Sequence, residues 1–246
     1  MKADPRDQQR LLDLQAIDTR AAQLDRARSK LPVLARLEEL ARTRMLANDD
    51  VVSAQTEHGD LEREVTKAEA DVQLVRDRAA RDQAHLDSGR GTAKELTALQ
   101  HEMASLARRQ SELEEIELDV MERAEAAEME LARARTQLAQ VDAQISEARA
   151  ERDEQQADLG AQLAEALAPR DALVAELPED LVALYEKLRA SHGGLGAAML
   201  HARRCLGCQL ELNAADMTRI RDAAADEVLR CEECSRILVR TAESGL

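Results

Sequence analysis

Residues 88–96 read SGRGTAKEL, a short glycine-containing stretch that separates two long segments of helical periodicity. Gly89 and Gly91 are expected to end one helix and reverse the chain, because glycine is a poor helix former and is favoured in turns. Thr92 can cap a second helix, with Glu95 three residues later to complete a capping box. The stretch therefore predicts a tight reversal between two helices.

Apolar residues follow a coiled-coil spacing on both sides of this turn. Before it, a 3-4 spacing runs without interruption from Val33 to Leu86, and thirteen of its sixteen positions are apolar. After it, a second frame runs from Leu96 to Ala166, and sixteen of its twenty-one positions are apolar. A period near 3.5 residues that persists over so many turns is typical of a coiled-coil seam.

The two seams are in phase across the turn. If the chain folds back around residue 91, facing residues have numbers that sum to 181 or 182, as in Leu61 with Val120 and Leu37 with Ile145. Eleven of sixteen such layers are apolar on both sides. Two parallel chains could also use these seams, but the phase match across a short glycine turn favours an antiparallel hairpin within one chain.

The composition agrees with a mainly α protein. Of 246 residues, 44% are hydrophobic and 34% are charged, with a single aromatic residue of the Phe, Trp and Tyr group, Tyr185. The core of an ordinary α/β enzyme relies on aromatic side chains for buried area, so this class is disfavoured. A formal net charge of −15 argues against a surface built to coat nucleic acid.

Membrane and export signals are not found in the sequence. No stretch approaches the roughly 18 uncharged apolar residues of a membrane span, and the first residues lack the apolar core of a signal peptide. We therefore expect a cytoplasmic protein without a membrane partner.

All four cysteines lie in the last 42 residues, as Cys205-Leu-Gly-Cys208 and, after 22 residues, Cys231-Glu-Glu-Cys234. The two-residue spacing lets both sulfurs of one turn face the same ion, with backbone amides supporting the thiolates. Gly207 is expected to supply a positive φ in the first turn. Two such turns offer four thiolates, which suit one tetrahedral zinc ion. Because four thiolates leave no open position for water, we expect this zinc to be structural.

Other interpretations of the cysteines stay open at this point. Four cysteines can hold an iron–sulfur cluster or act as redox dithiols. A redox enzyme that used Cys231 and Cys234 would need both thiols reactive and free of zinc. His201 lies four residues before Cys205 and is a further candidate ligand, although a strand position explains it more simply. No phosphate-binding loop or catalytic constellation is found, so we expect a non-enzymatic protein without a small-molecule substrate.

Prolines mark the ends of the coiled coil. Pro32 fits the first turn of a new helix and predicts a kink near residue 32. Beyond Pro169 and Pro178 the spacing changes, and one more helix is expected over residues 179–189. Short strand-like runs and a helix over residues 214–223 then predict a small α+β unit around the cysteines.

Two groups of residues are candidates for partner binding. The exposed hairpin tip is a candidate surface for a protein partner, with residues Gly89, Arg90, Gly91, Thr92 and Lys94. The cysteine-containing unit carries seven arginines that could contact phosphates if they gather on one face; they are Arg203, Arg204, Arg219, Arg221, Arg230, Arg236 and Arg240. Aromatic side chains for base stacking do not accompany them.

The residues resemble a known family, the bacterial C4-type zinc-ribbon proteins with an N-terminal antiparallel coiled-coil hairpin. The resemblance covers essentially the whole chain and is carried by residues 11–18, 92–99, 184–189, 205–208, 219–221 and 231–238. It implies a hairpin-plus-ribbon architecture and a non-enzymatic role. Some members are linked to the nitrogen-type sigma factor of RNA polymerase, to flagellar gene control, and to RNA or secretion components.

The chain departs from the family pattern at three positions. Ser235 follows the fourth cysteine where glycine is common, Val239 stands where an aromatic residue often follows, and Leu96 replaces a tip tyrosine. These changes leave the zinc assignment unaffected, but they weaken surfaces that would bind a partner by stacking.

The sequence thus predicts a mainly α protein with a small α+β domain at its C-terminus. A long antiparallel coiled-coil hairpin is expected over residues 1–178, with its tip at 88–92, and a connecting helix with a C4 zinc ribbon over 179–246. We expect a zinc-binding adaptor that uses the rigid hairpin and the ribbon for protein–protein interaction, in transcription or RNA metabolism. The alternative is a nucleic-acid-binding protein that acts through the ribbon arginines.

Overall fold

A computed structural model describes all 246 residues. Residues 35–149 form one compact unit, and residues 1–34 together with 150–246 form the other. None of the helices combines the length and apolar character needed to cross a membrane. In chain order the elements are α1 (Pro5–Ser29), α2 (Pro32–Asp87), α3 (Ala93–Leu167), α4 (Arg170–Ala175), α5 (Glu179–Ser191), β1 (Ala197–His201), β2 (Arg204–Cys205), α6 (Ala214–Asp222), β3 (Leu229–Arg230) and β4 (Ile237–Val239).

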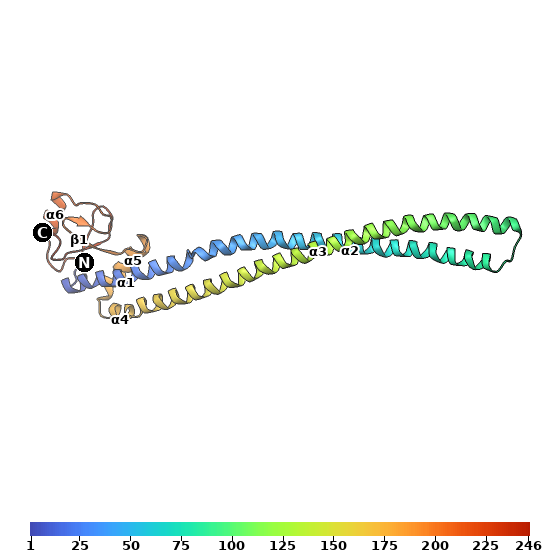
Figure 1. Cartoon of the computed structure of the whole chain (residues 1–246). Coiled ribbons are helices and arrows are strands. Elements are labelled where there is room, and N and C mark those ends of the chain that lie inside the picture. The colour runs from blue at the N-terminus through green and yellow to red at the C-terminus, as the bar shows by residue number, and fades with distance from the viewer. The chain divides into compact units, whose positions relative to one another are not determined.

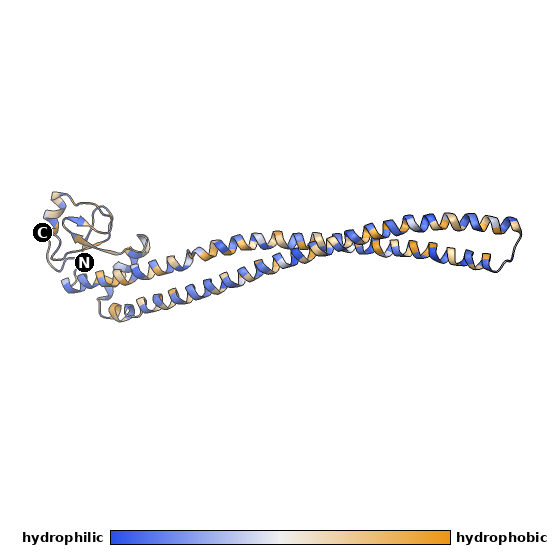
Figure 2. Cartoon of the chain, in the orientation of Figure 1, coloured by the Kyte–Doolittle hydropathy of each residue, from blue (hydrophilic) through white to orange (hydrophobic).

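The unit of residues 35–149 is an antiparallel helical hairpin, as predicted, in which α2 and α3 lie side by side (Figure 1). Hydrophobic residues recur along both helices (Figure 2). Between residues 37 and 86, fourteen of the fifteen predicted seam positions are buried or half-buried. The exception is Arg44, whose guanidinium instead pairs with Asp142 of α3 at 2.6 Å. The 3-4 spacing therefore identifies the buried face of α2.

Ion pairs between α2 and α3 agree with the antiparallel direction. Early residues of α2 pair with late residues of α3, and late residues of α2 pair with early ones. Each pair is solvent-exposed and contributes about 1 kcal/mol or less to stability. They specify alignment more than they stabilise the hairpin. The pairs are Arg44–Asp142 (2.6 Å), Arg76–Glu114 (2.6 Å), Glu64–Arg123 (3.7 Å) and Arg78–Glu102.

The predicted turn and capping box are present at the tip. Gly89 and Gly91 have φ values of 64° and 135°, which glycine adopts more readily than any other residue. The backbone N–H of Thr92 donates to Glu95 Oε2 at 2.7 Å, and the Glu95 N–H donates to Thr92 Oγ1 at 3.3 Å. The Thr92 hydroxyl also donates to Glu95 Oε2 at 2.9 Å, and the two hydrogen bonds that the carboxylate accepts from Thr92 lower the pKa of Glu95. Local sequence alone thus determines where the chain reverses.

The helix break at Pro32 is also confirmed, since α1 ends at Ser29 and α2 begins at Pro32. The predicted division at residue 178, however, does not follow the compact units, because α1 packs with the C-terminal part of the chain. Leu11 and Leu14 of α1 share one hydrophobic core with α5 and the sheet. Residues 1–34 therefore belong with the ribbon unit.

The sheet of this unit has the strand order β2-β1-β4-β3. Strands β1 and β4 are parallel, and the other two neighbouring pairs are antiparallel. Alternate residues face opposite sides of a sheet. Ala197 and Ile237 accordingly lie in the core with α1 and α5, whereas Ala198 and Leu238 lie in a second core with α6 and two of the cysteines. This small sheet therefore separates two cores.

Polar side chains tie α1 to the ribbon. The Gln15 side-chain amide donates to the Gly194 carbonyl at 2.9 Å and accepts from the Gly196 N–H at 2.7 Å. At the N-terminus, the Val228 N–H donates to the carbonyl of Met1 at 3.1 Å. These contacts join segments more than 170 residues apart in sequence, so a coiled-coil spacing rule could not reveal them.

A buried charged network lies beside this junction. The Asp18 carboxylate accepts from Arg170 Nε at 2.7 Å and from the Tyr185 hydroxyl at 2.8 Å, and Arg189 Nε lies 3.2 Å away. Glu186 pairs with both arginines. Burial, together with the hydrogen bond to Asp18, raises the pKa of Tyr185. The network links α1 with α5 and with the start of α4.

Candidate metal centre

The four cysteines lie in two turns that have the same backbone hydrogen bonds. In the first turn, the Gln209 N–H donates to the Cys205 carbonyl at 2.8 Å, and the Cys205 N–H donates to the Leu210 carbonyl at 3.0 Å. The repetition places each pair of sulfurs in an equivalent position. The corresponding bonds of the second turn run from Ser235 N–H to the Cys231 carbonyl (2.8 Å) and from Cys231 N–H to the Arg236 carbonyl (3.0 Å).

The two turns bring all four sulfurs together, within 4.8 Å of one another. Cys205 Sγ lies 3.9 Å from Cys234 Sγ, and Cys208 Sγ lies 3.9 Å from Cys231 Sγ. A tetrahedral zinc ion with Zn–S bonds of about 2.3 Å would hold sulfurs about 3.8 Å apart. The donor type, number and spacing therefore fit one structural zinc ion.

The surroundings of the thiols act on their protonation in opposite ways. Burial raises the pKa of Cys205 and Cys231. Hydrogen bonds from backbone N–H groups of the turns favour the thiolates and oppose this rise, but they do not cancel it. At Cys234 burial is outweighed by hydrogen bonds from the backbone and side chain of Arg236 and from neighbouring thiols, so the pKa is lowered. The predicted support of the thiolates by backbone amides is thus present, and a bound Zn²⁺ would favour all four in the ionised form.

The prediction that Gly207 adopts a positive φ is wrong. Its φ is not positive; instead, a Cβ at this position would meet Ala198 Cβ at 2.9 Å and Arg236 Cδ at 3.0 Å. The residue that follows each cysteine pair is left-handed instead, Gln209 with φ 64° and Ser235 with φ 59°. Glycine is required at 207 for space, whereas the conformational demand falls two residues later.

This geometry favours glycine at position 235, where the resemblance leads us to expect one and this chain has serine. Left-handed backbone costs a non-glycine residue about 1–2 kcal/mol, partly offset by the greater freedom of glycine in the unfolded chain. We expect Ser235→Gly to stabilise the ribbon by about 0.5–1 kcal/mol. Denaturant unfolding of cobalt-substituted protein, followed by thiolate-to-cobalt absorption, measures this change. A lower midpoint for Ser235→Gly than for wild type would contradict it, and Ala183→Gly in the interior of helix α5 serves as a destabilising control.

Two of the seven predicted nucleic-acid-binding arginines each donate to several backbone carbonyls of the ribbon. The Arg236 guanidinium donates to the carbonyl of Leu195 at 3.0 Å and to that of His192 at 3.1 Å. The Arg240 guanidinium donates to five carbonyls at the end of α6 and just beyond it, including Ala223 at 2.9 Å. Both side chains therefore hold loops of the ribbon in place.

The other arginines are of two kinds. Arg230 Nε donates to the Ser235 carbonyl at 2.8 Å, and Arg219 pairs with Glu232 at 2.6 Å. The remaining three are exposed, and their side chains make no hydrogen bond or ion pair; they are Arg203, Arg204 and Arg221. These three are the members of the predicted set that are available to a phosphate.

The other predicted residues are placed as follows. His201 is the last residue of β1, is exposed, and lies 3.6 Å from Glu243, so it is not among the clustered metal-binding groups. At the tip, the carbonyl of Arg90 lies 3.1 Å from His85 Nε2, while the side chains of Arg90 and Lys94 are exposed and unpaired. The tip thus presents two free cations beside the glycine turn.

Comparison with known proteins gives the same two parts. A family model described as a CT398-like coiled coil hairpin domain matches residues 14–193, and one described as a C4-type zinc ribbon domain matches residues 204–238. An uncharacterized protein of Mycobacterium tuberculosis is 35% identical over 240 residues, which is 98% of each chain.

Solved structures also resemble the chain. A protein from Mycobacterium smegmatis has a TM-score of 0.87 and 37% identity, and the match covers 98% of this chain and all of that one. CT398 from Chlamydia trachomatis has a TM-score of 0.68 at 21% identity, covering 96% and 98%, a likeness of fold alone. The hairpin match, and the four cysteines inside the ribbon match, show that the chain belongs to the bacterial family with a CT398-like coiled-coil hairpin and a C4-type zinc ribbon.

Proposed function

We propose that the protein is a non-enzymatic cytoplasmic adaptor that binds a protein partner through its coiled-coil hairpin, in transcription or RNA metabolism. The observation that carries this proposal is apolar surface that the hairpin does not use for its own seam. Eight large hydrophobic side chains between residues 35 and 149 are exposed. Exposed apolar side chains mark an interaction site where they lie together, as Leu118 and Met121 do one helical turn apart on α3. The eight exposed side chains are Met45, Leu46, Val52, Leu74, Ile116, Leu118, Met121 and Met129.

In this proposal the zinc ion stabilises the ribbon and takes no part in chemistry. Four thiolates fill a tetrahedral site and leave no position for a water molecule or a substrate. The hairpin tip, with the free cations Arg90 and Lys94, is the first surface to test for partner binding.

A pull-down from host lysate tests the proposal, with each sample divided and one half treated with nuclease. The wild-type chain is expected to recover a protein partner that nuclease treatment does not remove. We expect the tip variant Arg90→Glu/Lys94→Glu, which keeps both glycines and the capping box, to lose that partner. A matched control, Lys67→Glu/Arg108→Glu, makes the same charge change elsewhere on the hairpin and should retain it. If both double variants recover the partner equally, the tip is not the binding surface; if wild type recovers no protein, the adaptor function is refuted.

The alternative function, nucleic-acid binding, is favoured by the three free ribbon arginines. If Arg203, Arg204 and Arg221 each contact a phosphate of duplex DNA, the logarithm of the binding constant should fall with the logarithm of salt concentration at a slope of about −3. The triple alanine variant should abolish most of this slope. Recovery in the pull-down that disappears with nuclease and ignores the tip variant would support this alternative.

A further inference from the structure

A groove with an apolar floor lies between α2 and α3 in the middle of the hairpin. Its floor includes Val65 of α2 and both Met121 and Ala124 of α3. Met121 is 39% exposed, and Leu118, three residues earlier on α3 and 57% exposed, lies one helical turn away from it. Val65 and Ala124 are only half-buried at the edge of the seam, so together with Met121 they leave apolar surface open to the groove.

Four glutamates form the rim of this groove, and no lysine or arginine lines it. Glu69, Glu125 and Glu128 make no hydrogen bond or ion pair through their side chains. The only ion-pair partner of the Glu62 carboxylate is His58, at 3.7 Å, and this histidine carries a charge only when its imidazole is protonated. The rim thus presents four carboxylates without a permanent counter-charge.

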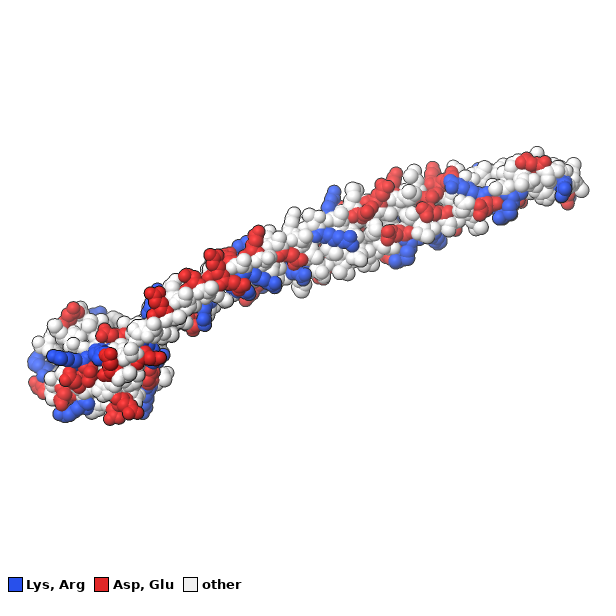
Figure 3. Space-filling model, turned by 90° about the horizontal axis from the view of Figure 1, so that it is seen from below, with Lys and Arg blue, Asp and Glu red and all other residues white.

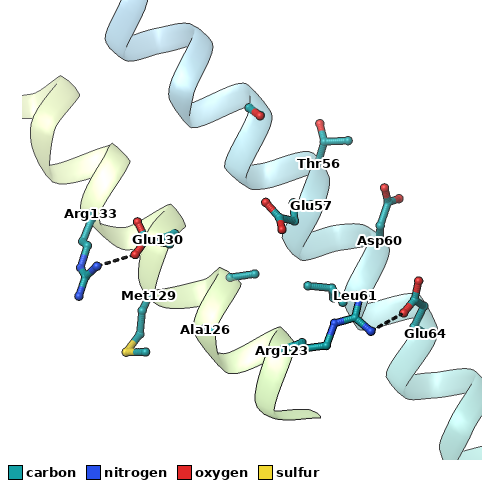
Figure 4. Close-up of a pocket in the computed structure, with 12 residues that line it drawn as sticks. Thr56, Glu57, Asp60, Leu61, Glu64, Arg123, Ala126, Met129, Glu130 and Arg133 are labelled. Carbon is teal, nitrogen blue, oxygen red and sulfur yellow. Dashed lines mark hydrogen bonds and ion pairs between the residues drawn. The ribbon is translucent and has the colours of Figure 1, made fainter. Parts of the chain in front are cut away.

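The opposite flank of the same helix pair has a different charge arrangement (Figure 4). There, Arg123 reaches across to Glu64 at 3.7 Å, and Arg133 pairs with Glu130 on its own helix. Asp60 is paired with Arg63. Most acids on that flank therefore have a cation within the hairpin, whereas those of the groove do not.

The groove also lies in the most acidic part of the chain. Residues 57–71 and 112–130 together contain fifteen Asp and Glu against three Lys and Arg, a net charge of −12 within a chain whose total is −15. Figure 3 shows acidic side chains along the coiled coil, with fewer basic ones among them. A second copy of the hairpin would bring like charges together, so a self-associated dimer is disfavoured here. Charge complementarity instead requires a basic occupant.

We propose that this groove, which we call the acidic groove, binds a basic amphipathic helix of a partner protein. The apolar face of that helix would cover Val65, Met121 and Ala124, and its lysines or arginines would pair with the rim glutamates. An amphipathic helix laid in a groove is a recurring mode of recognition, and methionine adapts readily to different apolar partners. The inference rests on the proposed protein-binding function but places a binding site on the hairpin flank rather than at its tip.

A synthetic peptide probes the acidic groove directly. The probe is a labelled helix of about twenty residues with leucine at 3-4 spacing and lysine and arginine on both sides of that stripe. A scrambled peptide of the same composition, which has no apolar stripe, is the ligand control. Fluorescence anisotropy at physiological salt, where charges are screened beyond about 8 Å, measures the affinity of each peptide for the full chain.

Two matched variants of the full chain separate the acidic groove from general acidity. Glu62→Gln/Glu69→Gln/Glu125→Gln/Glu128→Gln removes four charges from the rim, and Glu57→Gln/Asp60→Asn/Glu64→Gln/Glu130→Gln removes four from the opposite flank. We expect the first to weaken peptide binding about tenfold or more and the second by less than about threefold, since four rim ion pairs are lost only in the first. Circular dichroism establishes that both variants remain helical. Met121→Ala, which keeps every charge, should also weaken binding.

Three results would overturn the proposal that the acidic groove binds a basic helix. They are equal weakening of peptide binding by both quadruple variants, equal affinity for the scrambled peptide, and failure of the amphipathic peptide to bind the wild-type chain. The groove and the adaptor function fail separately. If the peptide binds as expected while the pull-down recovers no protein, the adaptor function is refuted. If a partner is recovered whose binding ignores the rim variant, the acidic groove is refuted as its docking site.

Discussion

Replacement of Cys231 by serine is expected to unfold the ribbon while the hairpin stays helical. Cys231 is buried, supplies one of four thiolates, and packs in the core that contains α6. The strands of this unit are only two to five residues long, and a structural zinc ion contributes on the order of 10 kcal/mol to the folding of such a unit. The hairpin seam contains no metal ligand, so its helices do not depend on the ion.

Hydrogen–deuterium exchange and metal analysis together measure this outcome. The wild-type chain should contain one zinc per molecule, and Cys231→Ser should contain little. Amides of β1 and β4 should lose their protection, while those of residues 37–86 keep it. Leu206→Ala, an exposed change inside the first cysteine turn, is the control and should retain the metal. A metal-free chain whose β1 and β4 amides still exchange slowly would show that zinc does not hold the ribbon.

Loss of the Asp18 carboxylate is expected to have the second large effect. In Asp18→Ala the buried Tyr185 hydroxyl loses its acceptor, and Arg170 is left with Glu186 alone. Removing one member of a buried charged network costs about 3–5 kcal/mol, because the remaining groups stay desolvated without a partner. Tyr185→Phe removes one hydrogen bond and should cost only about 1–2 kcal/mol.

The free energy of opening of α5 amides, from native-state hydrogen exchange, measures both changes. Asp25→Ala serves as the matched control on the same helix. Asp25 pairs with Arg28 at 3.1 Å, but both side chains are exposed, and such a pair contributes less than about 1 kcal/mol. Equal effects of Asp18→Ala and Asp25→Ala would mean that the network does not stabilise the junction.

The hairpin could be predicted from sequence because its determinants are periodic or local. The seam depends on apolar residues at 3-4 spacing, and the tip depends on Gly89, Gly91 and the Thr92–Glu95 capping box. The cysteine spacing likewise predicted the metal site, because two identical turns bring the four sulfurs together. In each case the residues that matter are close in sequence or repeat regularly.

The contacts of α1 could not be predicted in this way. Gln15 and Asp18 are polar, and on a helix with coiled-coil spacing such residues are expected on the solvated face. In the structure both side chains are buried, because their hydrogen-bond partners come from residues more than 150 positions away in sequence. These partners are Gly194 and Gly196 for Gln15, and Arg170 and Tyr185 for Asp18. No local pattern reports a hydrogen bond between such distant segments.

The acidic groove shows a further limit. The excess of Asp and Glu is visible in the sequence, but acidic residues on a coiled coil usually form a solvated, ion-paired surface. Only the packing of α2 against α3 shows that the acids of one flank are largely paired, whereas Glu69, Glu125 and Glu128 are not. Similarly, the demand for a left-handed residue at Ser235 follows from backbone geometry and not from residue type.

Hydrogen–deuterium exchange of the full chain, with and without the partner recovered by pull-down, tests most directly the claim that the hairpin is the binding surface. We predict that added protection falls within residues 35–149, at the tip, at the acidic groove or at both, and that residues 203–240 exchange unchanged. Added protection confined to the ribbon, with none on the hairpin, would contradict it.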